Sequence, residues 1–509
     1  MAGLQAFREA YVSAGSLPEF SDDFMDYDSR RLRYEIYWAF YESSVYNDVH
    51  DWATAYRRTQ GLYKYIRNIY NPAFRLGEFW KAHLWGGLLD PAAGDGKEFP
   101  SALPIVIDDE NAQADELRAA IGQVWEWSRW QVIKDLVTLR GSILGDVGIR
   151  VMDDVDRGKV YLQPVHPGTI EDIDLDPFGN VKGYTLQEVR EDPEKAGKDV
   201  TYTETAERDG DLVIYRTYRD NKPYAWNGTA EEWEEPYGFI PMVMIQHNNV
   251  GLDWGWSELQ PARSKIHEVD DLASNLSDQI RKTVNPVWLF SGLNKPSSAP
   301  DVTGADSSTS RPQPGREEMN ALYTTNPDAK ALPLVAPLDI AGVVQHIQEV
   351  LQQLEGDYPE LEYLKRRKEL GNISGRALRT IQQDPVVKVQ QRRAGYDDAI
   401  RRAQQMAVAI GGFREYDGFA GFGLDSYAAG DLDHQIGKRP VFDVDPMDEI
   451  EQEEAFWKVA ESAARAGVPL PVYLQFQGWS EERIAALVES EEYQAQQEAS
   501  RLMLGVNLG

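Results

Sequence analysis

Cysteine is absent from all 509 residues of the chain. Its absence excludes a disulfide framework, thiolate zinc sites, cysteine-ligated iron–sulfur clusters and a cysteine nucleophile, and it fits synthesis in a reducing compartment.

Long apolar runs are also missing. No stretch reaches the roughly 18 apolar residues of a membrane-spanning helix, so we expect no membrane contact. The first residues, Met1–Tyr11, are charged and do not resemble a secretory signal.

Basic residues are outnumbered. The chain has 52 Lys and Arg against 83 Asp and Glu, which gives a formal net charge of −31. Nucleic-acid-binding proteins neutralise phosphates with clustered Lys and Arg. The chain as a whole is therefore no ordinary DNA-binding protein, and only a local basic patch would touch DNA. The acidity also has a simpler interpretation, which is that it keeps the chain soluble.

Hydrophobic residues make up 42% of the chain, which suffices for a core, and the length predicts roughly three to four folding units.

Catalytic and metal-binding motifs are missing. The seven histidines form no HExxH pattern, and no P-loop, GxSxG or GxGxxG motif is present. The closest approach to a calcium loop is Asp172, Asp174 and Asp176, but Pro177 and Gly183 stand where an EF-hand needs Gly and Glu. We interpret this run as a hairpin turn. We expect no metal, no cofactor and no catalytic residue.

Hydrophobic spacing predicts an α+β fold. Residues 1–145 are expected to be mostly helical, and residues 113–144 to form one long amphipathic helix that ends at Gly145. The character changes at residues 148–246, where short alternating runs are separated by turn residues. This pattern is typical of strands and hairpins, so we expect a β-rich insert there.

Two helices with apolar stripes are predicted on either side of a proline-rich segment. The first covers 256–281 with Ser257 as N-cap, and the second begins near Asp339. Residues 282–337 contain eight prolines, and we interpret the low-complexity run 296–316 as a mobile loop at the edge of a small subdomain. The remaining predictions are a polar connection over 360–372, a helix over 374–410 that Pro385 breaks or kinks, and helices over 445–466 and 481–504.

The densest basic run is Lys365, Arg366, Arg367 and Lys368, which we place between two helices. One interpretation is a solvated helix end, where cations favour the helix dipole. The other is a loop of positive charge that contacts phosphates.

Five short motifs follow one another in an order that is similar to one known family. They are Tyr63–Asn68, Gly141–Met152, Lys159–Ile170, Phe239–Pro241 leading into Gly255–Leu259, and Asn372–Leu378. In this order they resemble the portal proteins of tailed bacteriophages, also called head-to-tail connectors.

The resemblance implies a portal-type subunit with a helical stem and crown, a β-rich wing and a small α/β clip. The implied domains are a wing over 1–255, a stem helix over 256–281, the clip over 282–337, a stem helix over 338–354, a tunnel loop over 355–373, a long helix with the wing return over 374–444, and a crown over 445–509. Lys365, Arg366, Arg367 and Lys368 are then the candidates for DNA-facing residues.

The function implied by the resemblance is a ring, usually of twelve copies, at one capsid vertex. Such a ring is the conduit for DNA packaging and ejection in the virion and is assembled in the host cytoplasm. The implied partners are further copies of the chain, the major capsid protein, the large terminase subunit, a head–tail adaptor, a scaffold protein and, transiently, double-stranded DNA. Twelve copies at −31 each would carry −372, an acidic wall to which DNA does not adhere.

Two other classes stay open. An acidic chain rich in Trp and Tyr is also compatible with a carbohydrate-active enzyme, which needs two carboxylates at a fixed separation, but no pair stands out in the sequence. The third possibility is a monomeric adaptor or scaffold.

Overall fold

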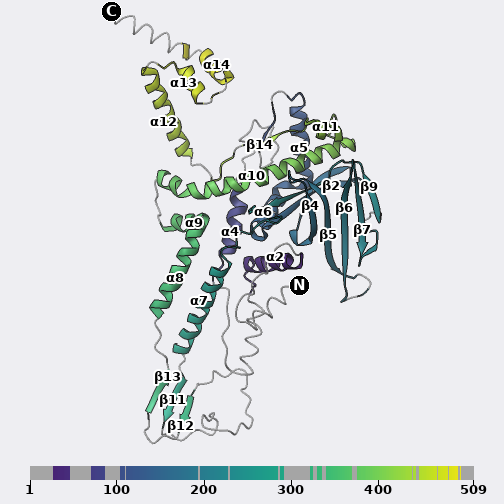
Figure 1. Ribbon diagram of the computed structural model, residues 1–509. Helices are drawn as coiled ribbons and strands as arrows, with labels where there is room; N and C mark the ends of the chain where they lie inside the picture. Colours follow the sequence, from purple (N-terminus) through teal and green to yellow (C-terminus); the bar gives the residue numbers. More distant parts are fainter. Residues whose placement is uncertain are drawn as a thin grey trace, which may run out of the picture. The chain divides into compact units, whose positions relative to one another are not determined.

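The computed structural model describes most of the chain between residues 27 and 494, and the chain separates into two compact units, Met1–Val441 and Phe442–Gly509 (Figure 1). The described residues are 27–45, 70–85, 104–108, 111–192, 195, 197–226, 230–284, 287–291, 321–324, 330–334, 340–369, 375–437, 439–442, 446–466, 468–477, 479, 481–490 and 493–494. Helices and antiparallel sheets are both present, so the predicted α+β class is confirmed.

Within the described residues, four helices precede the first long strand. They are α2 (Tyr27–Tyr41), α4 (Pro72–His83), α5 (Ala114–Ser128) and α6 (Trp130–Leu144). The prediction of one helix over 113–144 is wrong, because the chain breaks at Arg129, which adopts a left-handed conformation with φ 53° and ψ 46°. The Ser128 hydroxyl there accepts a hydrogen bond from the Leu162 amide at 2.8 Å, and Trp130 is buried. The break thus lets the chain anchor a strand and bury an indole.

A three-stranded antiparallel sheet follows directly from α6. Its order is β10 (Met242–Gln246), β2 (Asp146–Asp154) and β3 (Lys159–Val165). Gly145 ends α6 with φ 101°, a left-handed value that favours glycine. A Cβ there would lie 2.7 Å from the Gly255 carbonyl oxygen, so the close approach of these two segments also requires glycine.

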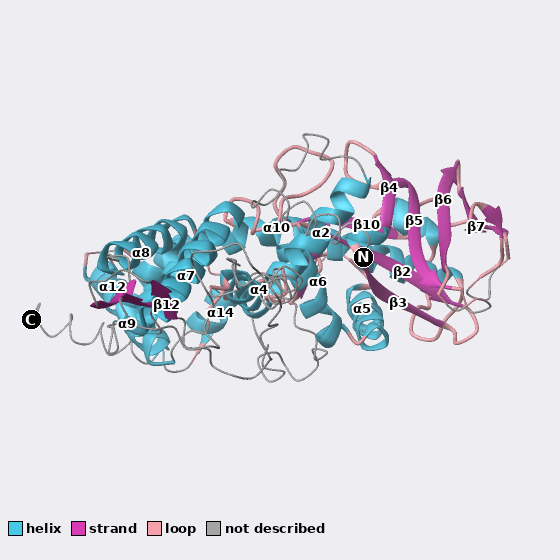
Figure 2. Cartoon of the chain, turned by 90° about the horizontal axis from the view of Figure 1, so that it is seen from below, coloured by secondary structure: helices cyan, strands magenta, loops and turns pink. Residues whose placement is uncertain are grey.

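A second antiparallel sheet completes the predicted β-rich region. It consists of β4 (Ile170–Leu175), β5 (Val181–Glu191), β6 (Asp199–Asp209), β7 (Leu212–Arg219) and β8 (Lys222–Pro223) in that order, with β9 (Glu232–Glu235) also paired to β7. Strands β4 to β7 lie side by side in Figure 2. The turn between β4 and β5 is held by Asp176, whose Oδ1 accepts the amides of Phe178 and Asn180 at 2.8 Å each. The hairpin interpretation of this acidic run is therefore confirmed.

The predicted helices on either side of the proline-rich segment are present with shifted bounds. They are α7 (Arg263–Val284) and α8 (Ile340–Asp357). Helix α7 starts later than predicted, because residues 258–262 form turns. Between the two helices lies a small sheet of order β12 (Ala321–Thr324), β11 (Val287–Ser291) and β13 (Lys330–Leu334), in which β11 is parallel to β12 and antiparallel to β13. The predicted low-complexity loop at 296–316 lies outside the described residues.

The segment after α8 differs from its prediction. The expected polar connection over 360–372 is mostly the helix α9 (Pro359–Glu369). Helix α10 (Gly375–Phe413) continues through Pro385 rather than ending there. A proline inside a helix removes one backbone hydrogen bond, but the second half of α10 is anchored by buried side chains such as Tyr396 and Ile400. After α10 come α11 (Leu424–Ala429) and β14 (Gln435–Ile436), which pairs with β1 (Ile105–Val106).

The second unit is helical. It contains α12 (Pro446–Arg465), α13 (Leu470–Phe476) and α14 (Glu481–Glu489). Its first two helices meet at a small aromatic cluster, in which Phe456 and Trp479 stack with ring centroids 6.1 Å apart and Tyr473 lies 6.0 Å from Phe456. The helix predicted over 481–504 is described only in part.

The apolar core of the first unit lies where the N-terminal helices meet the start of α7 and the end of α8. It combines Tyr34, Tyr37 and Phe40 of α2 with Leu259, Ile266 and Leu354. Among the described helices, none combines the length and apolar character needed to cross a bilayer.

Candidate functional site

Helices α7 and α8 form an antiparallel pair. They lie side by side in both views (Figures 1 and 2), and Lys265 near the start of α7 forms an ion pair with Asp357 at the end of α8. The seam is apolar, since Ile266 and Val269 of α7 and Leu354 of α8 are buried. Other apolar side chains on the same two helices stay exposed. Ile280 is 40% exposed, Ile340 42% and Val344 36%.

A buried charged junction lies at the base of this pair, and Glu258 is its centre. The Glu258 carboxylate accepts hydrogen bonds from Lys388 Nζ at 2.8 Å and Arg392 Nε at 3.2 Å, both on α10. The His247 ring Nε2 lies 3.1 Å from the same carboxylate. Lys388 also contacts Glu360 of α9 at 2.7 Å. One lysine therefore connects the segment before α7 to α9 and α10.

The electrostatics of the junction depend on that lysine. Burial alone would raise the pKa of Glu258, but Lys388 and the hydrogen bond with His247 hold it well below its usual range. The pKa of Glu360 is raised, because burial outweighs the attraction of Lys388. Burial would lower the pKa of Lys388, and the two carboxylates raise it instead. Glu258 and Lys388 are thus both charged at neutral pH.

Asp146, at the start of β2, is a second buried anion near the junction. It accepts hydrogen bonds from the Tyr34 hydroxyl and from the Gly255 amide, each at 2.7 Å. Burial raises its pKa to about 6, although both hydrogen bonds oppose the rise. Asp146 therefore connects helix α2, strand β2 and the segment that leads into α7.

Two of the sequence motifs that are far apart in the chain meet beside this junction. Ser257 donates a hydrogen bond to the Ile143 carbonyl oxygen at 2.5 Å, and the His247 amide donates to the Gly145 carbonyl oxygen at 2.8 Å. The motifs Gly141–Met152 and Gly255–Leu259 are thereby brought into contact. The motif Tyr63–Asn68 lies outside the described residues.

The predicted basic residues lie on α9 rather than in a loop. Lys365 is exposed, and its Nζ forms an ion pair with Glu355 of α8 at 2.6 Å. The side chains of Arg366, Arg367 and Lys368 lie outside the described part of the structure, so their role as DNA-facing residues stays a prediction. Sequence reasoning missed Lys388 and Glu360. The only sequence signal for a buried charge was Glu258, next to the apolar stripe of Leu259 and Ile266.

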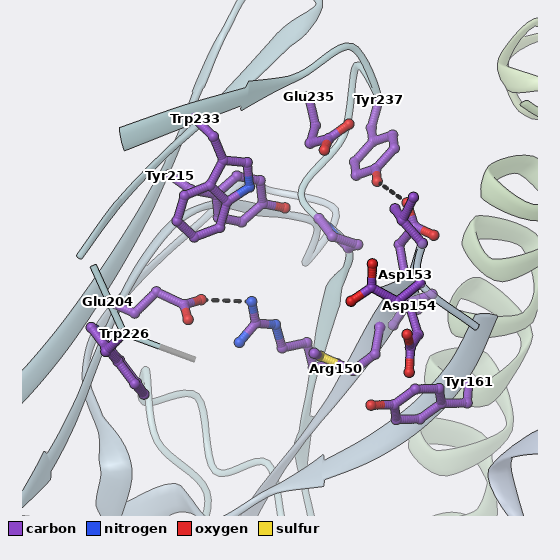
Figure 3. Close-up of a pocket in the computed structure, with 15 residues that line it drawn as sticks. Arg150, Asp153, Asp154, Tyr161, Glu204, Tyr215, Trp226, Trp233, Glu235 and Tyr237 are labelled. Atoms are coloured by element: carbon purple, nitrogen blue, oxygen red, sulfur yellow. Dashed lines mark hydrogen bonds and ion pairs between the residues drawn. The ribbon is translucent and has the colours of Figure 1, made fainter. Parts of the chain in front are cut away.

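A cavity of about 470 Å³ is lined by both sheets of the β-rich region (Figure 3). Arg150, Asp153 and Asp154 come from β2, Glu204 from β6, and Tyr215 from β7. Trp233 stands opposite Tyr215 in the β7–β9 register, and the two rings stack with centroids 4.9 Å apart and planes 8° apart.

Each deep carboxylate of this cavity has a partner. Glu204 forms an ion pair with Arg150 at 2.6 Å. Arg414 contacts Asp153 at 2.7 Å and Glu235 at 2.6 Å. Burial raises the pKa of Glu235 despite Arg414. Glu204, Asp153 and Glu235 therefore each lie beside an arginine.

No metal-binding cluster of three or more His, Asp or Glu side chains occurs in the described part of the chain. No family model matches the sequence, and no curated protein matches it.

Proposed function

We propose that the chain is the subunit of a ring-shaped phage portal, the conduit through which DNA enters and leaves a capsid at one vertex. The observation that carries the proposal is the helix pair α7–α8 with its exposed apolar side chains Ile280, Ile340 and Val344. Scattered exposed apolar residues are common, but these three lie on one pair of long helices. A neighbouring copy in a ring would cover them.

The order of elements supports the same proposal. A β-rich region leads into α7, a small sheet follows, α8 returns to the start of α7, and α9 with the basic run comes next. The chain's charge of −31 supports it further, because an acidic bore repels phosphates and lets a duplex slide. The proposed partners are the major capsid protein, the large terminase subunit, a head–tail adaptor and a scaffold protein, and the proposed location is the virion after assembly in the host cytoplasm.

Ring formation is the first test. Native mass spectrometry and negative-stain imaging of the full chain are expected to show closed rings, twelve copies each, with a central hole. Val344→Glu places a charge on the exposed apolar flank and should leave single subunits, because burying an unpaired carboxylate costs several kcal/mol at every contact. Gln353→Glu is the matched control, since Gln353 is exposed and lies nine residues, about two and a half helical turns, from Val344 on the opposite side of α8, and it should leave assembly unchanged.

Compact single subunits of the unmodified chain under every assembly condition would overturn the proposal. They would favour the alternatives of an acidic enzyme or a monomeric scaffold. Circular dichroism separates a failure to assemble from a failure to fold, because Val344 is exposed in the isolated chain and its substitution should leave the subunit's helicity intact.

The basic run is tested separately. Rings with Lys365, Arg366, Arg367 and Lys368 all changed to Gln should assemble but package or retain less DNA, because brief phosphate contacts are lost. The control neutralises four exposed lysines of the β-rich region, Lys182, Lys195, Lys198 and Lys222. Equal packaging by both variants would show that the basic run does not contact DNA.

A further inference from the structure

The cavity between the two sheets carries an excess of negative charge. Five carboxylates line it, from Asp153, Asp154, Asp156, Glu204 and Glu235, against one guanidinium, from Arg150, which leaves a formal charge of −4. Arg414 and Arg157 contact lining carboxylates, and counting them leaves −2. The pKa of Glu235 is raised by burial even beside Arg414, so this carboxylate would gain from a further cation.

Aromatic faces form a second and independent feature of the same cavity. Tyr215 and Trp233 stack at its wall, and Trp226 and Tyr161 also line it (Figure 3). The face of an aromatic ring attracts a cation, and indole does so most strongly. The cavity is open to solvent, and Val155, one of its lining residues, is 60% exposed. Its volume of about 470 Å³ falls in the usual range of ligand sites, which is about 300–1,000 Å³.

We propose that this cavity binds an organic cation, either an alkylammonium or a guanidinium group, which stacks on the Tyr215–Trp233 wall and pairs with the carboxylates at the opening. Phosphates and other anions are excluded by the negative charge. A neutral sugar would stack on the same rings, but it would gain nothing from the excess charge. Arg150 is already held by Glu204 at 2.6 Å, so the cavity's own guanidinium does not satisfy the remaining carboxylates.

Two sources supply this chemistry. One is a free polyamine, and the other is a Lys or Arg side chain of a partner protein. The site lies in the β-rich region and the proposal does not depend on ring formation, so it can be tested on the chain in whatever state it adopts.

Isothermal titration calorimetry of the full chain with putrescine and with N-acetyl-arginine amide tests the proposal. At least one of the two should bind, and binding should weaken as ionic strength rises. Tighter binding of putrescine would assign the site to a free polyamine, and tighter binding of the arginine amide to a protein side chain. Maltotriose and inorganic phosphate serve as the neutral and anionic probes. The proposal would be overturned if maltotriose alone bound. It would also be overturned if neither cation bound at concentrations of about 10 mM, which is about the weakest affinity that the method resolves.

Asp154→Asn is the informative variant, because the Asp154 side chain lines the cavity, is 21% exposed and, among the described residues, forms an ion pair with the exposed Arg157. It should weaken cation binding by about tenfold, the size of one lost charge-assisted hydrogen bond. Asp172→Asn makes the same change on β4 outside the cavity and should have no effect. Trp233→Leu should weaken binding severalfold while leaving the salt dependence intact. Equal affinities for Asp154→Asn and Asp172→Asn would contradict the assignment.

Discussion

Replacing Lys388 with Met tests whether one buried lysine holds the base of the helix pair together. Its Nζ lies 2.8 Å from Glu258 and 2.7 Å from Glu360, whose side chains are 4% and 0% exposed. Methionine has a similar length, so the substitution removes the charge without opening a large cavity. Two buried carboxylates would then face each other, and the nearby Arg392 and His247 contact Glu258.

The magnitude follows from the burial. Removing one partner of a buried ion pair costs about 3–5 kcal/mol in free energy of unfolding. The first unit spans about 440 residues, and an unfolding entropy of about 2.1 cal/mol/K per residue makes about 0.9 kcal/mol/K. The Tm should therefore fall by about 3–5 °C.

The loss should also depend on pH. The folded-state pKa of Glu360 lies above its ordinary value of 4.5 because of burial, and losing Lys388 would raise it further. A group with a raised folded-state pKa stabilises the fold below its unfolded pKa and loses that contribution as pH rises. The variant should therefore be most destabilised at pH 7 and less so near pH 5.

Differential scanning calorimetry at pH 7 and pH 5 measures both effects, with the exposed Lys182→Met as the control. Adding Glu360→Gln to Lys388→Met removes the stranded carboxylate and should recover part of the lost stability. A variant with unchanged Tm, or one whose loss is equal at both pH values and is not reduced by Glu360→Gln, would refute this account of the junction.

Three smaller predictions concern other buried or strained positions. Burial and the nearby Arg140 lower the pKa of His166 to about 4, so the unfolded chain binds a proton that the folded chain does not between pH 6.5 and 4, and stability falls as pH falls through that window. His166→Asn should remove up to about 3 kcal/mol of this loss. Urea unfolding at several pH values measures it, and a variant whose stability follows the same pH profile as the unmodified chain would contradict it. Tyr34→Phe deletes the 2.7 Å hydrogen bond to buried Asp146 and should cost about 2–3 kcal/mol in urea unfolding, so a loss below about 0.5 kcal/mol would show that the bond contributes little. Arg129 has φ 53°, a left-handed conformation that glycine adopts more easily than valine. The free energy of unfolding of Arg129→Gly should therefore exceed that of Arg129→Val by about 1–2 kcal/mol. Equal stabilities of the two variants would show that the left-handed turn stores no strain.

Local patterns in the sequence were enough to predict the strands over 148–246, the hairpin turn at Asp176 and the stripes of α7 and α8. Each depends on residues within a few positions of one another, where the periods of helix and strand and the preferences of turn residues act directly. The α+β class and the acidic character of the chain were likewise predictable from local patterns and composition alone.

The break between α5 and α6 was not predictable in this way, because the apolar spacing runs on through Arg129 and only the packing of Ser128 against β3 and the burial of Trp130 reveal it. The ion pair of Glu258 with Lys388 joins residues 130 positions apart, and the cavity draws its rings and carboxylates from strands of two different sheets. Burial decides whether a charge is solvated or must find a partner, and burial is a property of the folded chain. Composition and periodicity therefore determined the elements, and tertiary packing alone decided which charges and rings would meet.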